Sequence, residues 1–241
     1  MIQERFVGNH YECGFRFGSL LAERGNFILE QIPFSITEER LQFAAACLPV
    51  YKKYFPKILE EIRGIAEGQR CPAERLQAVL FSMYAMPPAS CCSCFAVSNG
   101  AQVFLARNSD FLLALQHWNG NVIYRLDGRC FHFTGNTTAF VEIEDGVNEH
   151  GLAAGLTSVS PGRIQPGLNA GMLLRLMLET CRTVEQALAL ARRVPIASAQ
   201  TLTLADAGGA IAVLECNSSR LEVVRPAPGR PFVCATNTFH S

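Results

Sequence analysis

The dipeptide Asn99-Gly100 constrains the fold more than any other feature of this sequence. It stands between two segments with strand-like patterning, residues 92–98 and 101–107. Asn-Gly is the strongest short hairpin signal, because both residues tolerate the positive φ that a two-residue β-turn requires. The pattern therefore predicts an antiparallel hairpin in which the start of the first strand lies beside the end of the second.

The residues before this hairpin carry helical signals. A first helix is expected from residue 10, where Gly14 and Gly18 would permit close packing against a neighbour. Residues 56–68 begin with proline, place isoleucines on one face and end at a glycine, so they predict a second helix. A third helix is expected over residues 73–86, ended by Pro87-Pro88.

The residues after the hairpin indicate more sheet, interrupted by two helices. Strands in hairpins, then helices, then further hairpins favour antiparallel sheet with helices packed on its faces rather than βαβ units. Neither G-x-G-x-x-G nor G-x-x-x-x-G-K occurs, which excludes the usual nucleotide-binding motifs. Strands are predicted over residues 122–126, 130–134, 139–143, 151–159, 201–205, 210–216, 221–224 and 232–235, and helices over residues 170–181 and 184–193.

Composition excludes several classes of protein. The 241 residues are 49% hydrophobic and 17% charged, a balance that can support a packed core and argues against disorder. The 21 basic and 21 acidic residues cancel, so no charge excess favours nucleic acid or an anionic membrane. The N-terminus resembles no signal peptide and no apolar run could span a bilayer. A cytoplasmic protein is expected, with most of its ten cysteines buried and reduced.

The most unusual stretch is Ser90-Cys-Cys-Ser-Cys-Phe95, at the start of the predicted hairpin. A cysteine-rich core strand would explain it without any function. A zinc site is disfavoured because no second ligand pair of suitable spacing follows, and a disulfide is disfavoured in a reducing compartment. Strand alternation places Cys91 and Cys92 on opposite faces, whereas Cys94 shares the face of Cys92.

A catalytic role is indicated by Ala106-Arg-Asn-Ser-Asp110, which returns to the same end of the hairpin. An arginine beside a cysteine favours the thiolate, and an aspartate could hold an ammonium group. This grouping suits a Cys92 that becomes a chain N-terminus, because its α-amine (pKa about 7.7–8.0) and thiol (about 8.5) are matched for proton exchange. One residue would then supply both nucleophile and base.

The sequence resembles the self-cleaving N-terminal-nucleophile acyltransferases related to acyl-CoA:6-aminopenicillanate acyltransferase and, more distantly, the choloylglycine (bile salt) hydrolases. The resemblance rests first on the Cys92 hairpin just described. Four further motifs occur in the family's order: Tyr11-Glu-Cys-Gly-Phe-Arg-Phe-Gly18, Glu60-Glu-Ile-Arg-Gly-Ile-Ala-Glu-Gly68, Gly146-Val-Asn-Glu-His-Gly-Leu152 and Ala235-Thr-Asn-Thr-Phe239. Each motif is weak alone, and their common order makes the set specific.

The resemblance implies a role for each matched residue. Cys92 would be the nucleophile, released by autocatalytic cleavage of the Cys91–Cys92 peptide bond. Arg107 would lie beside its sulfur, and Asp110 would bind the new α-amine. The backbone N–H of Asn148 and the side-chain amide of Asn237 would form the oxyanion hole. Taken singly, these four partners of Cys92 could equally be turn, cap or surface residues, and Cys91 remains the alternative nucleophile.

The implied fold is α+β, a four-layer αββα sandwich with two antiparallel sheets, preceded by a mainly helical region. Residues 1–91 would form a helical propeptide or small chain that stays docked, and residues 92–241 the catalytic region. Family members continue past the position of Ser241, so this region is expected to be truncated or abbreviated relative to them. No cofactor and no metal are expected. The expected partners are a small-molecule amide or acyl thioester and the cleaved N-terminal chain, without nucleic acid or membrane, and oligomer formation is left open.

Three alternatives accompany this hypothesis. An unprocessed Cys-His thiol hydrolase could use His150 or His240 as its base, although the sequence shows nothing to orient either ring. An inactive relative could serve as a binding or scaffold domain. A cysteine-rich metal module is the third.

Overall fold

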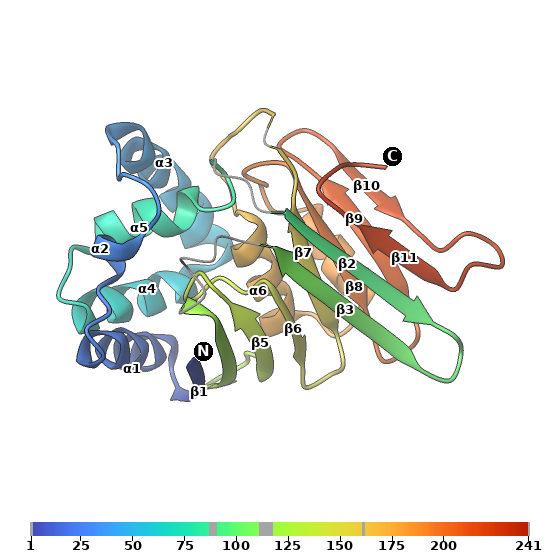
Figure 1. Ribbon diagram of the computed structural model, residues 1–241, viewed down its shortest axis with the longest axis horizontal. Coiled ribbons are helices and arrows are strands. Elements are labelled where there is room, and N and C mark those ends of the chain that lie inside the picture. Colours follow the sequence, from blue (N-terminus) through green and yellow to red (C-terminus); the bar gives the residue numbers. More distant parts are fainter. Residues whose placement is uncertain (1, 87–90, 111–117, 161, 241) are drawn as a thin grey trace.

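The computed structural model describes residues 2–86, 91–110, 118–160 and 162–240, and it is a mixed α+β structure with two sheets (Figure 1). The helices are α1 His10–Glu23, α2 Ile28–Gln31, α3 Glu38–Tyr54, α4 Pro56–Gly68, α5 Ala73–Ser82, α6 Ala170–Thr180 and α7 Val184–Ala191. The strands are β1 Ile2–Gly8, β2 Cys91–Ser98, β3 Val103–Asp110, β4 Gly120–Leu126, β5 Phe133–Thr137, β6 Asp145–Asn148, β7 Ala153–Ser158, β8 Gln200–Ala205, β9 Ile211–Cys216, β10 Leu221–Val224 and β11 Phe232–Ala235.

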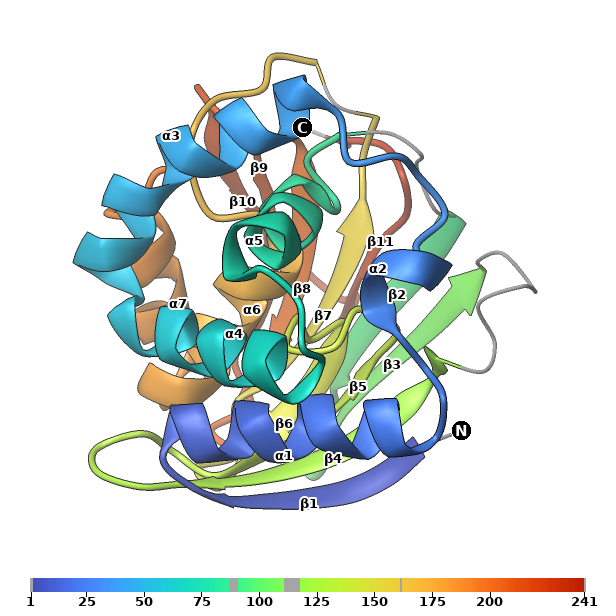
Figure 2. The same cartoon turned by 90° about the vertical axis from the view of Figure 1, so that its left-hand side faces the viewer.

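The two sheets face each other. The larger has the strand order β1-β4-β5-β6-β7-β8-β9-β10 and is antiparallel except for the parallel pair β1/β4. The smaller has the order β11-β2-β3 and packs across β7, β8 and β9. Helices α6 and α7 cover the opposite face of the large sheet, and α1 to α5 gather at one end of the molecule (Figures 1 and 2). The expected α+β fold with two sheets is confirmed.

The predicted hairpin is formed by β2 and β3. Gly100 has a φ of +86°, and the side chain of Asn99 accepts hydrogen bonds from the backbone N–H groups of Ala101 and Gln102. The side chains of β2 alternate: Cys92 and Cys94 are buried between the sheets, whereas Phe95 is 46% exposed on the outer face. The outer face of the small sheet is thus open in the described part of the chain.

Helices α1 and α4 are in unusually close contact, as the glycines of α1 led us to expect. A Cβ added to Gly14 or Gly64 would overlap backbone atoms of the opposite helix, and one added to Gly68 would lie 2.6 Å from the Phe15 carbonyl oxygen. Only glycine allows two helix backbones to approach this closely.

Three of the predicted elements need correction. The strand predicted over residues 130–134 is β5, Phe133–Thr137, and so begins three residues later. Residues 139–143, predicted as a strand, form a tight turn with an isolated bridge between Ala139 and Glu142, and Phe140 has a φ of +61°. The third helix ends at Ser82, before the predicted residue 86. Pro87-Pro88, its expected terminator, lies outside the described residues. Strands β1 and β6 and helices α2 and α3 were not predicted.

Within the described ranges, no helix is both long enough and apolar enough to cross a membrane.

Candidate active site

Cys92 lies near the start of β2 and faces the large sheet. Its Cα pairs with that of Ser109, and its side chain is 4% exposed. Arg107 is opposite Cys94, two residues further along β2, and its long side chain reaches back so that Nη2 donates a hydrogen bond to Cys92 Sγ at 3.2 Å. The hairpin therefore places a guanidinium directly against this sulfur.

Arg107 is fixed by three further acceptors from the large sheet. Nε donates to the carbonyl oxygen of Leu156 at 2.7 Å, and Nη1 donates to Glu144 Oε2 at 3.1 Å and to Asp145 Oδ2 at 3.4 Å. Burial alone lowers the pKa of Arg107, but the charges of Glu144 and the Cys92 sulfur outweigh this effect and the net pKa is raised. Arg107 is thus a permanent, oriented positive charge at the sulfur.

Glu144 is itself held in place. Its Oε1 accepts hydrogen bonds from Tyr84 Oη at 2.8 Å and from the Thr138 backbone N–H at 3.1 Å, and it also contacts Thr138 Oγ1. Burial, followed by the charge of Glu144, raises the pKa of Tyr84 well above its usual range, so the phenol remains a donor. These hydrogen bonds to Oε1 hold the Glu144 carboxylate in place, so that Oε2 is directed at Arg107.

Asn237 approaches Cys92 from the segment after β11. Its Oδ1 accepts the backbone N–H of Cys92 at 2.9 Å, and its Nδ2 donates to the Ser158 carbonyl oxygen at 2.6 Å. The same segment is anchored through Thr236, whose carbonyl oxygen accepts from Thr157 Oγ1 at 2.6 Å. Both the sulfur and the backbone nitrogen of Cys92 are thus in contact with predicted site residues.

Cys94 lies on the same face of β2 as Cys92 and is a different kind of thiol. Burial raises the pKa of Cys94 to about 11, and a Cβ at Gly155 would come within 2.7 Å of its sulfur. Burial likewise raises the pKa values of Cys13 and Cys216 to about 12. These three thiols remain protonated at neutral pH and pack in the protein interior.

Asp110 is exposed at the end of β3. Its Cα pairs with that of Cys91, so β3 brings it level with the expected scissile bond. Its Oδ1 accepts a hydrogen bond from Asn108 Nδ2 at 2.9 Å. Its position along the strand fits the predicted role, while its carboxylate is bound to a neighbour on its own strand.

Asn148 does not have the predicted geometry. Its backbone N–H donates to the Leu152 carbonyl oxygen at 3.0 Å, so this group is already used within the turn after β6. Its Nδ2 binds the carbonyl oxygens of Leu178 and Cys181, and its Oδ1 accepts from the His150 and Leu152 N–H groups. In this structure the residue organises a buried Asx turn, and its assignment to the oxyanion hole stays a prediction.

The two histidines of the alternative Cys-His mechanism contact residues other than Cys92. The ring of His150 packs edge-on against Phe131 with centroids 4.3 Å apart. The backbone N–H of His240 donates to Glu215 Oε1 at 2.7 Å. No hydrogen bond between either imidazole and Cys92 is seen among the described residues.

A small cavity of about 190 Å³ lies beside Arg107, on the side of Glu144 and Asp145. Ser109, Asn121 and Asn136 also line it. Burial raises the pKa of Asp145, although the hydrogen bond from Asn136 and the charge of Arg107 act in the opposite direction. The cavity therefore combines hydrogen-bonding groups and carboxylates with a larger share of apolar lining.

Sequence reasoning missed Tyr84, Glu144 and Asp145. The one available signal was Glu142-Ile-Glu-Asp-Gly146, three acidic residues in a chain with few charges, next to a strand. Their contact with Arg107 depends on how the two sheets pack, and the spacing of residues along the chain does not reveal it.

Comparison with known proteins gives a family and two distant structural matches. The family model of acyl-coenzyme A:6-aminopenicillanic acid acyl-transferase matches residues 97–241. Penicillin V acylase from Agrobacterium tumefaciens is 18% identical with a TM-score of 0.42, over 61% of this chain and 52% of that one. A variant of conjugated bile acid hydrolase from Clostridium perfringens is 13% identical with a TM-score of 0.34, over 62% of this chain and 46% of that one. The chain thus spans about half the length of these two proteins. No curated protein matches it significantly.

Proposed function

Because this chain belongs to the acyl-coenzyme A:6-aminopenicillanic acid acyl-transferase family, we propose that it is a self-processed cysteine amide hydrolase or acyltransferase with Cys92 as nucleophile. The observation that carries the proposal is the pair of contacts made by this one residue. Its sulfur accepts from Arg107 at 3.2 Å, and its backbone nitrogen donates to Asn237 at 2.9 Å. An N-terminal nucleophile needs both groups positioned at once.

Processing would begin with attack of Cys92 Sγ on the carbonyl carbon of Cys91. The peptide C–N bond breaks as the C–S bond forms, and the Cys92 nitrogen takes up the proton that the thiol loses and becomes the α-amine. Water then hydrolyses the thioester, which gives a new carboxyl group on Cys91 and a free thiol on Cys92. Asn237 Oδ1 already accepts a hydrogen bond from the departing nitrogen and would keep it in place.

Turnover would use the same two groups. The α-amine, with a pKa of about 7.7–8.0, accepts the thiol proton as the sulfur attacks the substrate carbonyl. Arg107 stabilises the negative charge on sulfur. The amine or thiol leaving group takes the proton and departs, and water or an acceptor amine then removes the acyl group from Cys92.

Two further residues would assist this chemistry. We assign Asn237 Nδ2 as a donor to the tetrahedral oxyanion, a role worth about 3–4 kcal/mol for one well-placed donor. Asp110 would turn toward the ammonium group once the Cys91–Cys92 bond is cut, since its Cα pairs with that of Cys91. The cavity beside Arg107 would hold part of the substrate.

Intact-mass analysis tests the proposal. Purified wild-type protein should give two fragments, residues 1–91 and 92–241, while Cys92→Ala should remain a single chain. Cys234→Ser is the matched control, because this exposed cysteine lies in β11 of the same sheet and should not affect cleavage. A wild-type protein that stays uncut on long incubation yet turns over an amide would exclude the N-terminal amine as base. An uncut protein whose Cys92 also resists an acylating probe would favour the inactive scaffold.

A further inference from the structure

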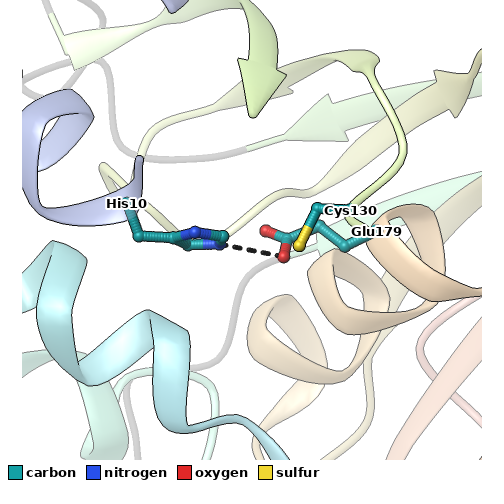
Figure 3. Close-up of side chains that lie close together, drawn as sticks. All are labelled: His10, Cys130 and Glu179. Carbon is teal, nitrogen blue, oxygen red and sulfur yellow. Dashed lines mark hydrogen bonds and ion pairs between the residues drawn. The ribbon is translucent and has the colours of Figure 1, made fainter. Parts of the chain in front are cut away.

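A second group of chemically reactive side chains lies outside the Cys92 site. His10 is the first residue of α1, Cys130 lies between β4 and β5, and Glu179 is in the last turn of α6 (Figure 3). One nitrogen, the sulfur and one carboxylate oxygen of these residues all lie within 4.8 Å of one another. The function proposed above uses none of the three.

The spacing of these atoms is close to that of a tetrahedral metal site. Zinc binds sulfur at about 2.3 Å and nitrogen or oxygen at about 2.0–2.2 Å, which puts neighbouring ligand atoms about 3.3–3.8 Å apart. His10 Nε2 and Glu179 Oε2 are 3.0 Å apart. Closing the group around an ion therefore requires movements of about 1 Å, which side-chain rotation can supply.

The carboxylate is pre-oriented by a second hydrogen bond. Arg175 Nε donates to Glu179 Oε1 at 2.7 Å, which leaves Oε2 directed at His10. Arg175 is in turn held by Glu61 Oε2 at 2.7 Å, and both residues of this pair are fully buried. Outer partners of this kind orient carboxylate ligands in metal sites.

One positive charge near the sulfur can move away. Lys57 Nζ lies 3.4 Å from Cys130 Sγ. Lys57 is exposed on α4, so its flexible side chain can withdraw into water when an ion takes its place. His10 and Glu179 are only 4% and 1% exposed, so they would not need to leave water to bind the ion.

Access is provided by a cavity of about 400 Å³, lined by His10, Lys57 and Asp127 among others. It is large enough for a metal ion with a bound water. Three protein ligands and one open position are the usual arrangement of a zinc ion that keeps a water.

We propose that His10, Cys130 and Glu179 bind Zn²⁺, with water from this cavity as the fourth ligand. The ion would join a residue of the 1–91 region to two residues of the 92–241 region. Its binding does not depend on the function proposed for Cys92.

Cobalt(II) substitution tests the site directly, because Co²⁺ bound by a thiolate in tetrahedral geometry gives a near-ultraviolet charge-transfer band and strong visible bands. Wild-type protein, Cys92→Ala and Cys234→Ser should all show these bands, and Cys130→Ser should lose the charge-transfer band. Absence of the band in wild type, or its survival in Cys130→Ser, would overturn the proposal. Loss in Cys92→Ala with retention in Cys130→Ser would place the ion at the nucleophile instead.

Thermal unfolding provides a readout that does not depend on the sulfur. Zinc at a hundredfold excess over its Kd should raise the Tm of wild type by about 5–10 °C. His10→Gln should remain folded by circular dichroism and show less than a third of this rise. An equal rise in His10→Gln would exclude this residue as a ligand and contradict the site.

Discussion

Removing either partner of the Arg107–Glu144 ion pair should destabilise the protein by about 2–3 kcal/mol, because the structure buries both groups. Their side chains are 4% and 6% exposed. Removing one member of a buried ion pair typically destabilises a protein by about 3–5 kcal/mol, since the other charge is left without its partner in a medium of low polarity.

The contacts left to the remaining partner put both substitutions at or below the lower end of this range. Arg107→Met leaves Glu144 with its hydrogen bonds from Tyr84 and Thr138, so a loss of about 3 kcal/mol is expected. Glu144→Gln leaves Arg107 with Asp145 and the Leu156 carbonyl oxygen, so about 2 kcal/mol is expected. The double variant should lose only about 3 kcal/mol, which corresponds to a coupling of about 2 kcal/mol.

Urea unfolding of all four proteins in a Cys92→Ala background measures this cycle on a single uncut chain. For Arg107→Met the predicted loss corresponds to a decrease in Tm of about 6–12 °C. Arg225→Met, which removes an exposed ion pair with Glu185, is the control and should change stability by less than about 1 kcal/mol. Losses that add to within about 0.5 kcal/mol would refute the claim that Glu144 positions Arg107.

Three other predictions concern separate parts of the molecule. Asn237→Ala should retain self-cleavage better than turnover, with kcat reduced about 10²–10³-fold. Intact mass measures the cleavage and an amidase assay measures the turnover. Equal retention of both activities would remove Asn237 from the oxyanion hole. Gly64→Ala should destabilise by at least about 1–3 kcal/mol in thermal melts, because its Cβ meets the backbone of α1, while Gly162→Ala has open space and should be neutral. Burial raises the pKa of Glu142 well above its usual range, so the folded state binds a proton more tightly than the unfolded state and loses stability as pH rises above about 4.3. Glu142→Gln should therefore gain stability over wild type between pH 4 and pH 8, and an unchanged difference would contradict this sign.

Local patterns predicted five of the seven helices of the described residues, and the central hairpin. Helix α4 has the predicted bounds of residues 56–68, and α7 begins at the predicted residue 184, where Thr183 caps it by accepting from the Gln186 N–H. Helix α3 was missed because Pro49 interrupts its pattern, although the helix continues through this residue. Strand β1 was missed because a parallel partner 118 positions away leaves no local signal, as the pairing Ile2↔Gly120 illustrates.

The contacts of the candidate site also differ in whether local sequence patterns could predict them. Arg107 meets Cys92 within one short hairpin, so counting from the turn was enough to bring them together. Glu144 reaches Arg107 only because the large sheet packs against the small one, a long-range contact that residue patterns do not encode. Asn148 shows the limit of a motif: it matches the family resemblance, but in the structure its backbone N–H is bound to Leu152 within a turn.

Strand β1 would tie the two fragments together after a cut at Cys92. All seven residues of β1 pair with β4, so the first fragment would contribute a border strand to a sheet built mainly by the second. Removal of that fragment would expose unpaired amide and carbonyl groups along one side of β4. An exposed sheet edge of this kind can pair with strands of other chains. The severed pieces should therefore purify together, and forced separation should lead to aggregation.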